Sequence, residues 1–166
     1  MNTTPVRLSS PGLFLRLAVA VYDSMVLLAV LFLATAVALP VTHGLAIPAE
    51  NPFFQAYLLL VAFLYLGWFW TRAGQTVAMR AWRLRVVDVD GDAIGWGSAL
   101  ARFMAVLLPT LPILLLLGFV PLDNQWAVLL ILGAWLCGFL WVVVDKENRA
   151  WHDILSGTRV VQDPKS

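Results

Sequence analysis

Four long stretches of this chain contain no charged residue, and no other feature constrains its fold as strongly. They cover residues 24–42, 53–71, 103–120 and 126–144. An uncharged apolar stretch of about 18 residues is long enough to cross the hydrocarbon core of a bilayer as a helix. The composition agrees, because 61% of the residues are apolar and 13% are charged, against roughly 45–50% and about 25% in soluble domains. The sequence therefore predicts an all-α membrane protein.

The apolar pattern of the first stretch continues back across Asp23, so the four predicted transmembrane helices are at 13–39, 53–71, 103–120 and 126–144. Short connections rich in turn-forming residues join the first helix to the second and the third to the fourth. We therefore expect two helical hairpins in a single membrane domain over 1–166. Pro109 and Pro112 predict a kink in the third helix. The polar remainder is a loop over 72–102 and a tail over 145–166.

The positive charges predict the orientation of these helices. All eleven Lys and Arg residues lie before or at the start of the first helix, in the loop over 72–102 or in the tail. The two short connections contain only His43, Glu50 and Asp123 as titratable residues. Segments rich in Lys and Arg stay on the cytoplasmic side of a membrane. We therefore expect the loop, the tail and both termini to be cytoplasmic.

The cytoplasmic loop and tail share a short pattern. Residues 82–94 alternate and turn as a β-hairpin does, so they predict a small cytoplasmic β-hairpin or strand element. In the tail, residues 159–161 repeat the Arg-Val-Val of residues 85–87, which makes the tail a candidate partner strand. These echoes also raise the hypothesis of a degenerate repeat whose two halves have the same membrane orientation.

An aspartate-rich turn lies inside that loop. Asp88, Asp90 and Asp92 have the spacing of the first three ligands of a calcium-binding EF-hand loop. That loop also needs glycine at its sixth position and glutamate at its twelfth, whereas here glycine is fourth and Ala99 is twelfth. The pattern therefore favours a plain hairpin turn.

Asp23 is the charged residue that lies deepest in a predicted helix. It follows Arg16 by two helical turns, so the two side chains share one face but lie about 10 Å apart along the axis, too far to pair directly. Arg16 can extend its guanidinium to the interface. A carboxylate at membrane depth costs about 2.5–3.5 kcal/mol and needs a partner, a proton or water. We expect Arg102, at the matching depth of the third helix, to be that partner.

Two interpretations of these charges remain open. In one, Asp23, Arg16 and Arg102 form an ion, proton or solute site. In the other, they only clamp the first and third helices together. The depth of Asp23 favours the first interpretation, and the cytoplasmic placement of nearly every other charge favours the second.

Several of these features together resemble the RDD family of bacterial membrane proteins, which is named for one arginine and two aspartates. The resemblance rests on Arg16 with Asp23, on Gly74-Gln75-Thr76 ahead of an Arg-Val-Val strand, and on His152-Asp153 followed by Gly-Thr. It covers nearly the whole chain. It implies that Arg16 is the family arginine, that Asp23 is the first aspartate, and that the second is Asp153 or, as the alternative, Asp145.

The family's loop motif, Gly-Gln-Thr-x-Gly-Lys-Arg, is only partly kept. Gly74, Gln75, Thr76 and Arg80 match it, but residues 78 and 79 are alanine and methionine in place of glycine and lysine. The loss of the lysine weakens any argument for phosphate binding there. The resemblance implies a bacterial inner-membrane location and no firm activity, with ligand transport and, for some members, cation/proton exchange in view.

Other chemistry has little support in the sequence. No spacing indicates a nucleophile triad, a metal site or a phosphate-binding glycine loop, so we expect no enzyme, catalytic residue or cofactor. The net charge of +1 argues against a nucleic-acid partner. Cys137, within an apolar run, is expected to be an inert core residue. His152 titrates near neutrality and is a candidate sensor of cytoplasmic pH, whereas Asp153 is expected to accept backbone amides or pair with an arginine.

Two functions follow as expectations. The first is a small transport component, a homo-oligomer because four helices form a small pathway, that uses Asp23 for a proton, cation or solute. The second is a membrane assembly, lipid-binding or regulatory subunit, in which the charges lock the helices and the basic cytoplasmic face binds anionic lipid or another protein.

Overall fold

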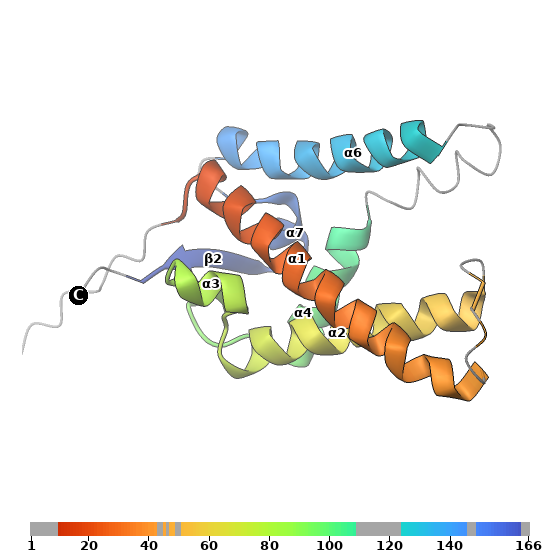
Figure 1. The fold of residues 1–166 in the computed structure, drawn as a ribbon. Coiled ribbons are helices and arrows are strands. Elements are labelled where there is room, and N and C mark those ends of the chain that lie inside the picture. Colours follow the sequence, from red (N-terminus) through yellow and green to blue (C-terminus); the bar gives the residue numbers. More distant parts are fainter. Residues whose placement is uncertain are drawn as a thin grey trace, which may run out of the picture.

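The structure, a computed structural model, describes residues 10–42, 45, 47–48, 51–108, 124–145 and 149–163. Within these ranges the chain is mostly helical, with one two-stranded sheet (Figure 1). The elements in chain order are α1 (Leu13–Ala38), η1 (Leu39–Thr42), α2 (Pro52–Arg72), α3 (Val77–Ala81), β1 (Leu84–Asp88), α4 (Trp96–Leu107), α6 (Asn124–Val144), α7 (Trp151–Leu155) and β2 (Thr158–Gln162).

Helices α1 and α2 match the first two predicted transmembrane helices. Asn51 starts α2 by accepting hydrogen bonds from the amides of Phe53 and Phe54, with Pro52 in the first turn. Both helices are long and apolar enough to cross a membrane. Large apolar side chains on them are exposed, for example Phe32 and Phe53. Such a surface is suited to lipid and not to water.

The second predicted hairpin is described only in part. Helix α4 begins at Trp96, earlier than the predicted 103, and the remainder of that predicted helix, including Pro109 and Pro112, lies outside the described residues. Helix α6 matches the fourth predicted helix closely. Helix α4 and the apolar stretch Val128–Val144 of α6 are shorter than a full span. Two of the four predicted transmembrane helices, α1 and α2, are therefore long enough to span a membrane. For the third and fourth, a full span stays a prediction.

Helix α6 lies along one side of the molecule, next to α1 and α7 (Figure 1). Most of its described side chains are exposed, and among the described elements α1 and α7 pack against it. Cys137 is among the exposed residues, so the prediction that it belongs to the core was wrong. An apolar run alone cannot tell a helix that faces lipid from one that faces protein.

The sheet confirms the predicted partner strand in the tail and corrects the predicted hairpin. Strand β1 pairs antiparallel with β2, with Val86 opposite Val160. Residues 93–94 form no strand, since Ile94 is buried in the core instead of extending the sheet. The aspartate-rich turn is present: Asp88 Oδ1 accepts hydrogen bonds from the amides of residues 90, 91 and 92.

The two strands belong to matching segments of the chain. When the residue numbers of α3 and β1 are shifted by one constant value, they coincide with those of α7 and β2. The same shift makes Val86 correspond to Val160, its partner in the sheet. The residues between helix and strand, Arg83 and Gly157, also correspond and both have positive φ, 56° and 61°. The strands therefore pair as two copies of one segment would if a two-fold axis passed between Val86 and Val160. This geometry supports the repeat hypothesis for these segments.

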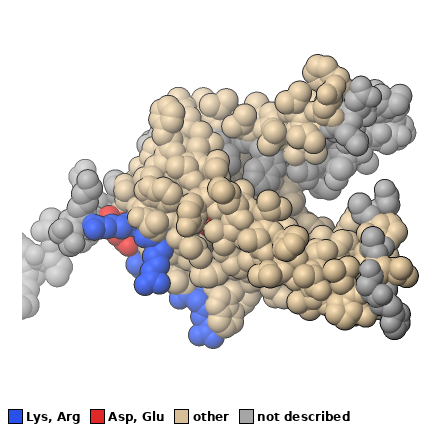
Figure 2. All heavy atoms as spheres, in the orientation of Figure 1, with Lys and Arg blue, Asp and Glu red and all other residues tan. Residues whose placement is uncertain are grey.

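The core lies where α1, α2 and α4 meet the sheet. Val19, Trp70, Phe103 and Val86 are buried there, together with smaller residues from α3. On the face shown in Figure 2, the visible charged side chains of the described residues gather at the end that carries α3 and the sheet. The charged end and the apolar body have the division expected for a protein partly embedded in lipid.

Candidate functional site

A buried charge cluster, which we call the clamp, joins Arg16, Arg102 and Asp153. Arg16 Nη1 donates to Asp153 Oδ2 at 2.6 Å, and Arg102 Nη1 donates to Asp153 Oδ1 at 2.5 Å. All three residues are at most 5% exposed. One carboxylate therefore connects α1, α4 and α7.

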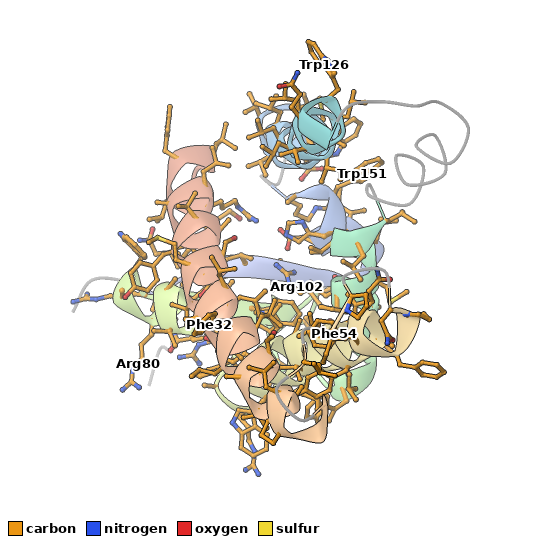
Figure 3. All side chains as sticks on the ribbon, turned by 45° about the vertical axis from the view of Figure 1, so that its right-hand side comes forward. Phe32, Phe54, Arg80, Arg102, Trp126 and Trp151 are labelled. Atoms are coloured by element: carbon orange, nitrogen blue, oxygen red, sulfur yellow. The ribbon has the colours of Figure 1, made fainter. Side chains whose placement is uncertain are left out.

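Further hydrogen bonds orient the clamp. The amide of Ala150 donates to Asp153 Oδ2 at 3.1 Å, which directs the carboxylate toward the start of α7. Arg102 Nη1 also donates to Thr158 Oγ1 at 2.6 Å, at the start of β2, and Arg16 Nε donates to the carbonyl of Pro11 at 3.2 Å. Figure 3 shows Arg102 in the interior of the molecule, whereas Arg80 points outward. Charge-assisted bonds of this kind are roughly twice as strong as neutral ones.

The clamp also decides the charge states of α7. Burial raises the pKa of Asp153, but Arg102, His152 and Arg16 together outweigh burial and hold that pKa well below its ordinary value. Burial lowers the pKa of the neighbouring His152 to about 4. The predicted role of His152 as a sensor of cytoplasmic pH is therefore wrong, because the imidazole stays neutral near pH 7. Its Nε2 lies 3.6 Å from Asp153 Oδ1, beyond hydrogen-bond distance.

Asp23 has partners other than the predicted Arg102. Its Oδ2 accepts the hydroxyl of Thr76 at 2.5 Å, and its Oδ1 accepts the amide of Ala78 at 3.2 Å. Arg102 is bonded to Asp153 instead. The prediction of an Asp23–Arg102 pair was wrong because it matched depth alone and could not include α7, which brings a carboxylate to the same depth.

The Gly74-Gln75-Thr76 motif builds the loop that carries Thr76 to Asp23. Gly74 has φ +66°, and its carbonyl accepts the amide of Val86 at 2.7 Å. Thr76 caps α3 by accepting the amide of Met79 while it donates to Asp23. Gln75 is half-buried, and Arg80 is exposed. The motif thus joins α2 to α1 and to the sheet.

A cavity of about 360 Å³ lies beside the clamp, between α1, α2 and α4. Arg16, Arg102, His152 and Asp23 line its polar part, and leucines and Phe103 line the remainder. One face of α1, at helical spacing, contributes Arg16, Val19, Ala20, Asp23, Ser24, Leu27 and Leu31. The volume lies within the roughly 300–1,000 Å³ of small-molecule sites.

The family model for the RDD family matches residues 10–157. The chain belongs to the RDD family. Its comparison with curated proteins and with solved structures gave no match. With two helices that can cross a bilayer, this RDD protein is a membrane protein.

The geometry bears on the choice between the two candidates for the second RDD aspartate. Asp153 joins Arg16 in the buried clamp, whereas Asp145 pairs with Arg149 at 3.2 Å, one turn away in the chain. The arginine and both aspartates of the RDD pattern thus lie close to one cavity if the second is Asp153. We therefore take Asp153 as that residue.

Sequence reasoning missed two residues around the clamp of this RDD protein. Trp70 is 6% exposed and lies under the Arg102 guanidinium, with 5.4 Å between Cζ and the ring centroid. Thr158 accepts a hydrogen bond from Arg102. The sequence pattern included Thr158 as the residue after Gly157 but gave it no partner. Only the clustering of tryptophans near the helix ends could have indicated Trp70. Among the described residues, no group of three His, Cys, Asp or Glu side chains is arranged to hold a metal ion.

Proposed function

We propose that this RDD protein is a small transport component in which Asp23 binds a cation or a proton. One observation carries the proposal. Asp23 lines the cavity, and within the described part of the chain its hydrogen-bond donors are neutral groups, a hydroxyl and an amide. A carboxylate at membrane depth without a cationic partner favours binding a cation or a proton.

The ion pairs of the clamp support this proposal, because the two arginines near Asp23 are bonded to another carboxylate. Arg16 and Arg102 are both bonded to Asp153, so the clamp interpretation applies to Asp153 and not to Asp23. Removing the charge of Asp23 leaves those ion pairs in place. The structural and the transporting carboxylate are therefore different residues in this proposal.

The location is part of the same proposal. The chain crosses the bacterial inner membrane several times, with the charged end and both termini in the cytoplasm, and acts by transport and not by catalysis. Positive residues at one end of the molecule support this orientation (Figure 2). A homo-oligomer would line a larger pathway than the few helices of one chain.

Flux measurements on purified protein test the proposal. Proteoliposomes with the wild type should dissipate an imposed proton or sodium gradient, and Asp23→Asn should abolish this flux while keeping the fold, since the amide is nearly isosteric. Asp145→Asn is the matched control, because its partly buried pair with Arg149 lies outside the cavity lining. A wild type that moves neither ion, or an active Asp23→Asn, would contradict the proposal.

A second function is favoured by a different observation. Arg72, Arg80, Arg83 and Arg85 are all exposed at the charged end of the molecule. Such a basic face suits the headgroups of anionic lipids, at about 1 kcal/mol per residue near the surface. Replacing Arg80 and Arg83 by glutamine should reduce the thermal stabilisation that phosphatidylglycerol gives over phosphatidylcholine in nanodiscs. A stabilising effect that is unchanged would exclude this role.

A further inference from the structure

The cavity beside the clamp has one polar and one apolar end. Along α1 its lining runs from Arg16 to Leu31, a distance of about 22 Å at 1.5 Å per residue. Leu27, Leu31 and Leu107 line the apolar part, and Arg102 and Trp70 belong to the polar part. A space of this shape fits a long molecule with a polar head and an apolar tail.

Two hydrogen-bond donors in this lining have no acceptor within the part of the chain that the structure describes. Arg102 Nε and Trp70 Nε1 are buried and lack a partner among the described residues. Arg102 is 3% exposed and Trp70 6% exposed, and the guanidinium lies against the indole ring. A buried donor without a partner costs about 1–3 kcal/mol. Both groups donate and neither accepts, so a ligand that satisfies them must offer acceptor oxygens.

The charge of Arg102 indicates the sign of that ligand. Its Nε is one of the two buried donors without a partner among the described residues, and a hydrogen bond from a guanidinium to an anion is stronger than one to a neutral acceptor. Leucines and Phe103 cover the rest of the cavity, which excludes a fully polar anion as a good fit.

We propose that the cavity binds an anionic amphiphile, with its carboxylate or phosphate head at Arg102 and Trp70 and its apolar tail along the leucines of α1. The proposal rests on the proposed function in one respect. Asp23 lines the same cavity, and its negative charge opposes an anionic head. A proton or cation on Asp23 removes this opposition, so the two ligands favour each other's binding.

Calorimetry on the full chain in phosphatidylcholine nanodiscs tests the proposal, with empty nanodiscs as the reference. The probes share a twelve-carbon tail: laurate, dodecyl phosphate, dodecanol and dodecyltrimethylammonium. The two anions should bind, and the alcohol and the cation should give no more heat than with empty discs. Tighter binding of laurate assigns a fatty acid as the source of the head, and tighter binding of dodecyl phosphate assigns a phospholipid. Equal binding of all four probes would overturn the site.

Trp70→Phe is the decisive variant, since it keeps an aromatic ring at this position and removes the indole N–H together with the five-membered ring. It should weaken laurate binding by about two- to tenfold, the value of one hydrogen bond. Trp68→Phe is the matched control, because Trp68 is exposed on the same helix, and its affinity should not change. Affinity that is unchanged in Trp70→Phe would refute the proposed head position.

Asp23→Asn separates this inference from the proposed function. Removing the opposing charge should tighten laurate binding at neutral pH, whether or not the protein moves ions. Laurate binding without any ion flux in the wild type would leave the amphiphile site standing and overturn the transport role. Ion flux without laurate binding would overturn the amphiphile site and leave the transport role standing.

Discussion

The hydroxyl of Thr76 donates to Asp23 Oδ2 at 2.5 Å while the same oxygen accepts the amide of Met79. One side chain therefore caps α3 and attaches it to α1. The amide of Ala78, in the first turn of α3, adds a second bond to Asp23. The loop that follows α2 is thus held against α1 by the carboxylate to which we assign ion binding.

Thr76→Val should destabilise the protein by about 1–2 kcal/mol, because it removes a helix cap and a donor to a carboxylate. Thr76→Ser keeps the hydroxyl and should stay within a few tenths of a kcal/mol of the wild type. Thermal unfolding in nanodiscs measures both. A loss in Thr76→Ser without a loss in Thr76→Val would show that the methyl packing of Thr76 matters and its hydroxyl does not.

Asp153→Asn should be the most damaging single-atom exchange in the clamp. It leaves two buried guanidiniums without their countercharge, and removing one partner of a buried pair costs about 3–5 kcal/mol. Asp145→Asn breaks a more exposed pair and should cost less than about 1 kcal/mol. Chemical denaturation of the two variants beside the wild type gives the comparison. A mild Asp153→Asn would mean that the clamp stabilises little.

Acid should destabilise the protein through His152. Its pKa is about 4 when folded, below the ordinary 6.5. Between these values the unfolded chain binds more protons, so stability falls as the pH drops, by up to about 1.4 kcal/mol per pH unit. Asp153 adds to the loss of stability when the pH falls below its ordinary pKa of 3.8, because its pKa in the folded protein is lower than that value. His152→Gln should flatten the melting temperature between pH 6.5 and 4, and an unchanged slope would assign the effect elsewhere.

Gly74→Ala should destabilise the loop before α3. Gly74 has φ +66°, and an added Cβ would lie 2.8 Å from Arg85 Cγ and 3.0 Å from the carbonyl oxygen of Val86. The left-handed backbone alone costs about 1–2 kcal/mol for a residue with a Cβ. Gly97→Ala is the control, since an added Cβ there meets nothing within 4 Å and lies in a helix, where alanine is favoured by up to about 1 kcal/mol. Their melting temperatures should move in opposite directions.

Single cysteines in a Cys137→Ala background test the orientation. Cysteines at Glu50 and Asp123 should react with an impermeant thiol reagent added outside intact cells. A cysteine at Arg83, which is exposed, should react only after the membrane is opened. Asp153 is unsuitable for labelling because it is fully buried. Labelling of position 83 from outside would reverse the predicted topology.

The sequence predicted the elements of this fold better than their contacts. Uncharged length alone located α1 and α2, because a helix in lipid needs little else. The repeated Arg-Val-Val located both strands of the sheet. Residues 93–94 misled because alternation near a turn is typical of a hairpin, whereas Ile94 packs into the core.

The candidate site was predicted as a set of residues but not as a set of pairs. Arg16 and Arg102 were predicted to lie at one depth, and both reach Asp153. Depth along a helix says nothing about which side the residue faces, so the partner of Asp23 was missed. The role of Trp70 could not be predicted without the fold, because a tryptophan near a helix end is equally typical of the membrane–water interface.

The bond between Arg16 and Asp153 joins residues that are 137 positions apart. At about 5–20 residues per second of synthesis, the ribosome needs on the order of ten seconds to supply the carboxylate after the arginine. During that time Arg16, and later Arg102, are already made while their shared countercharge is not. A nascent chain that stops before α7 therefore lacks the carboxylate that Arg16 and Arg102 share in the finished fold. The clamp forms only after nearly all of the matched family region has been made.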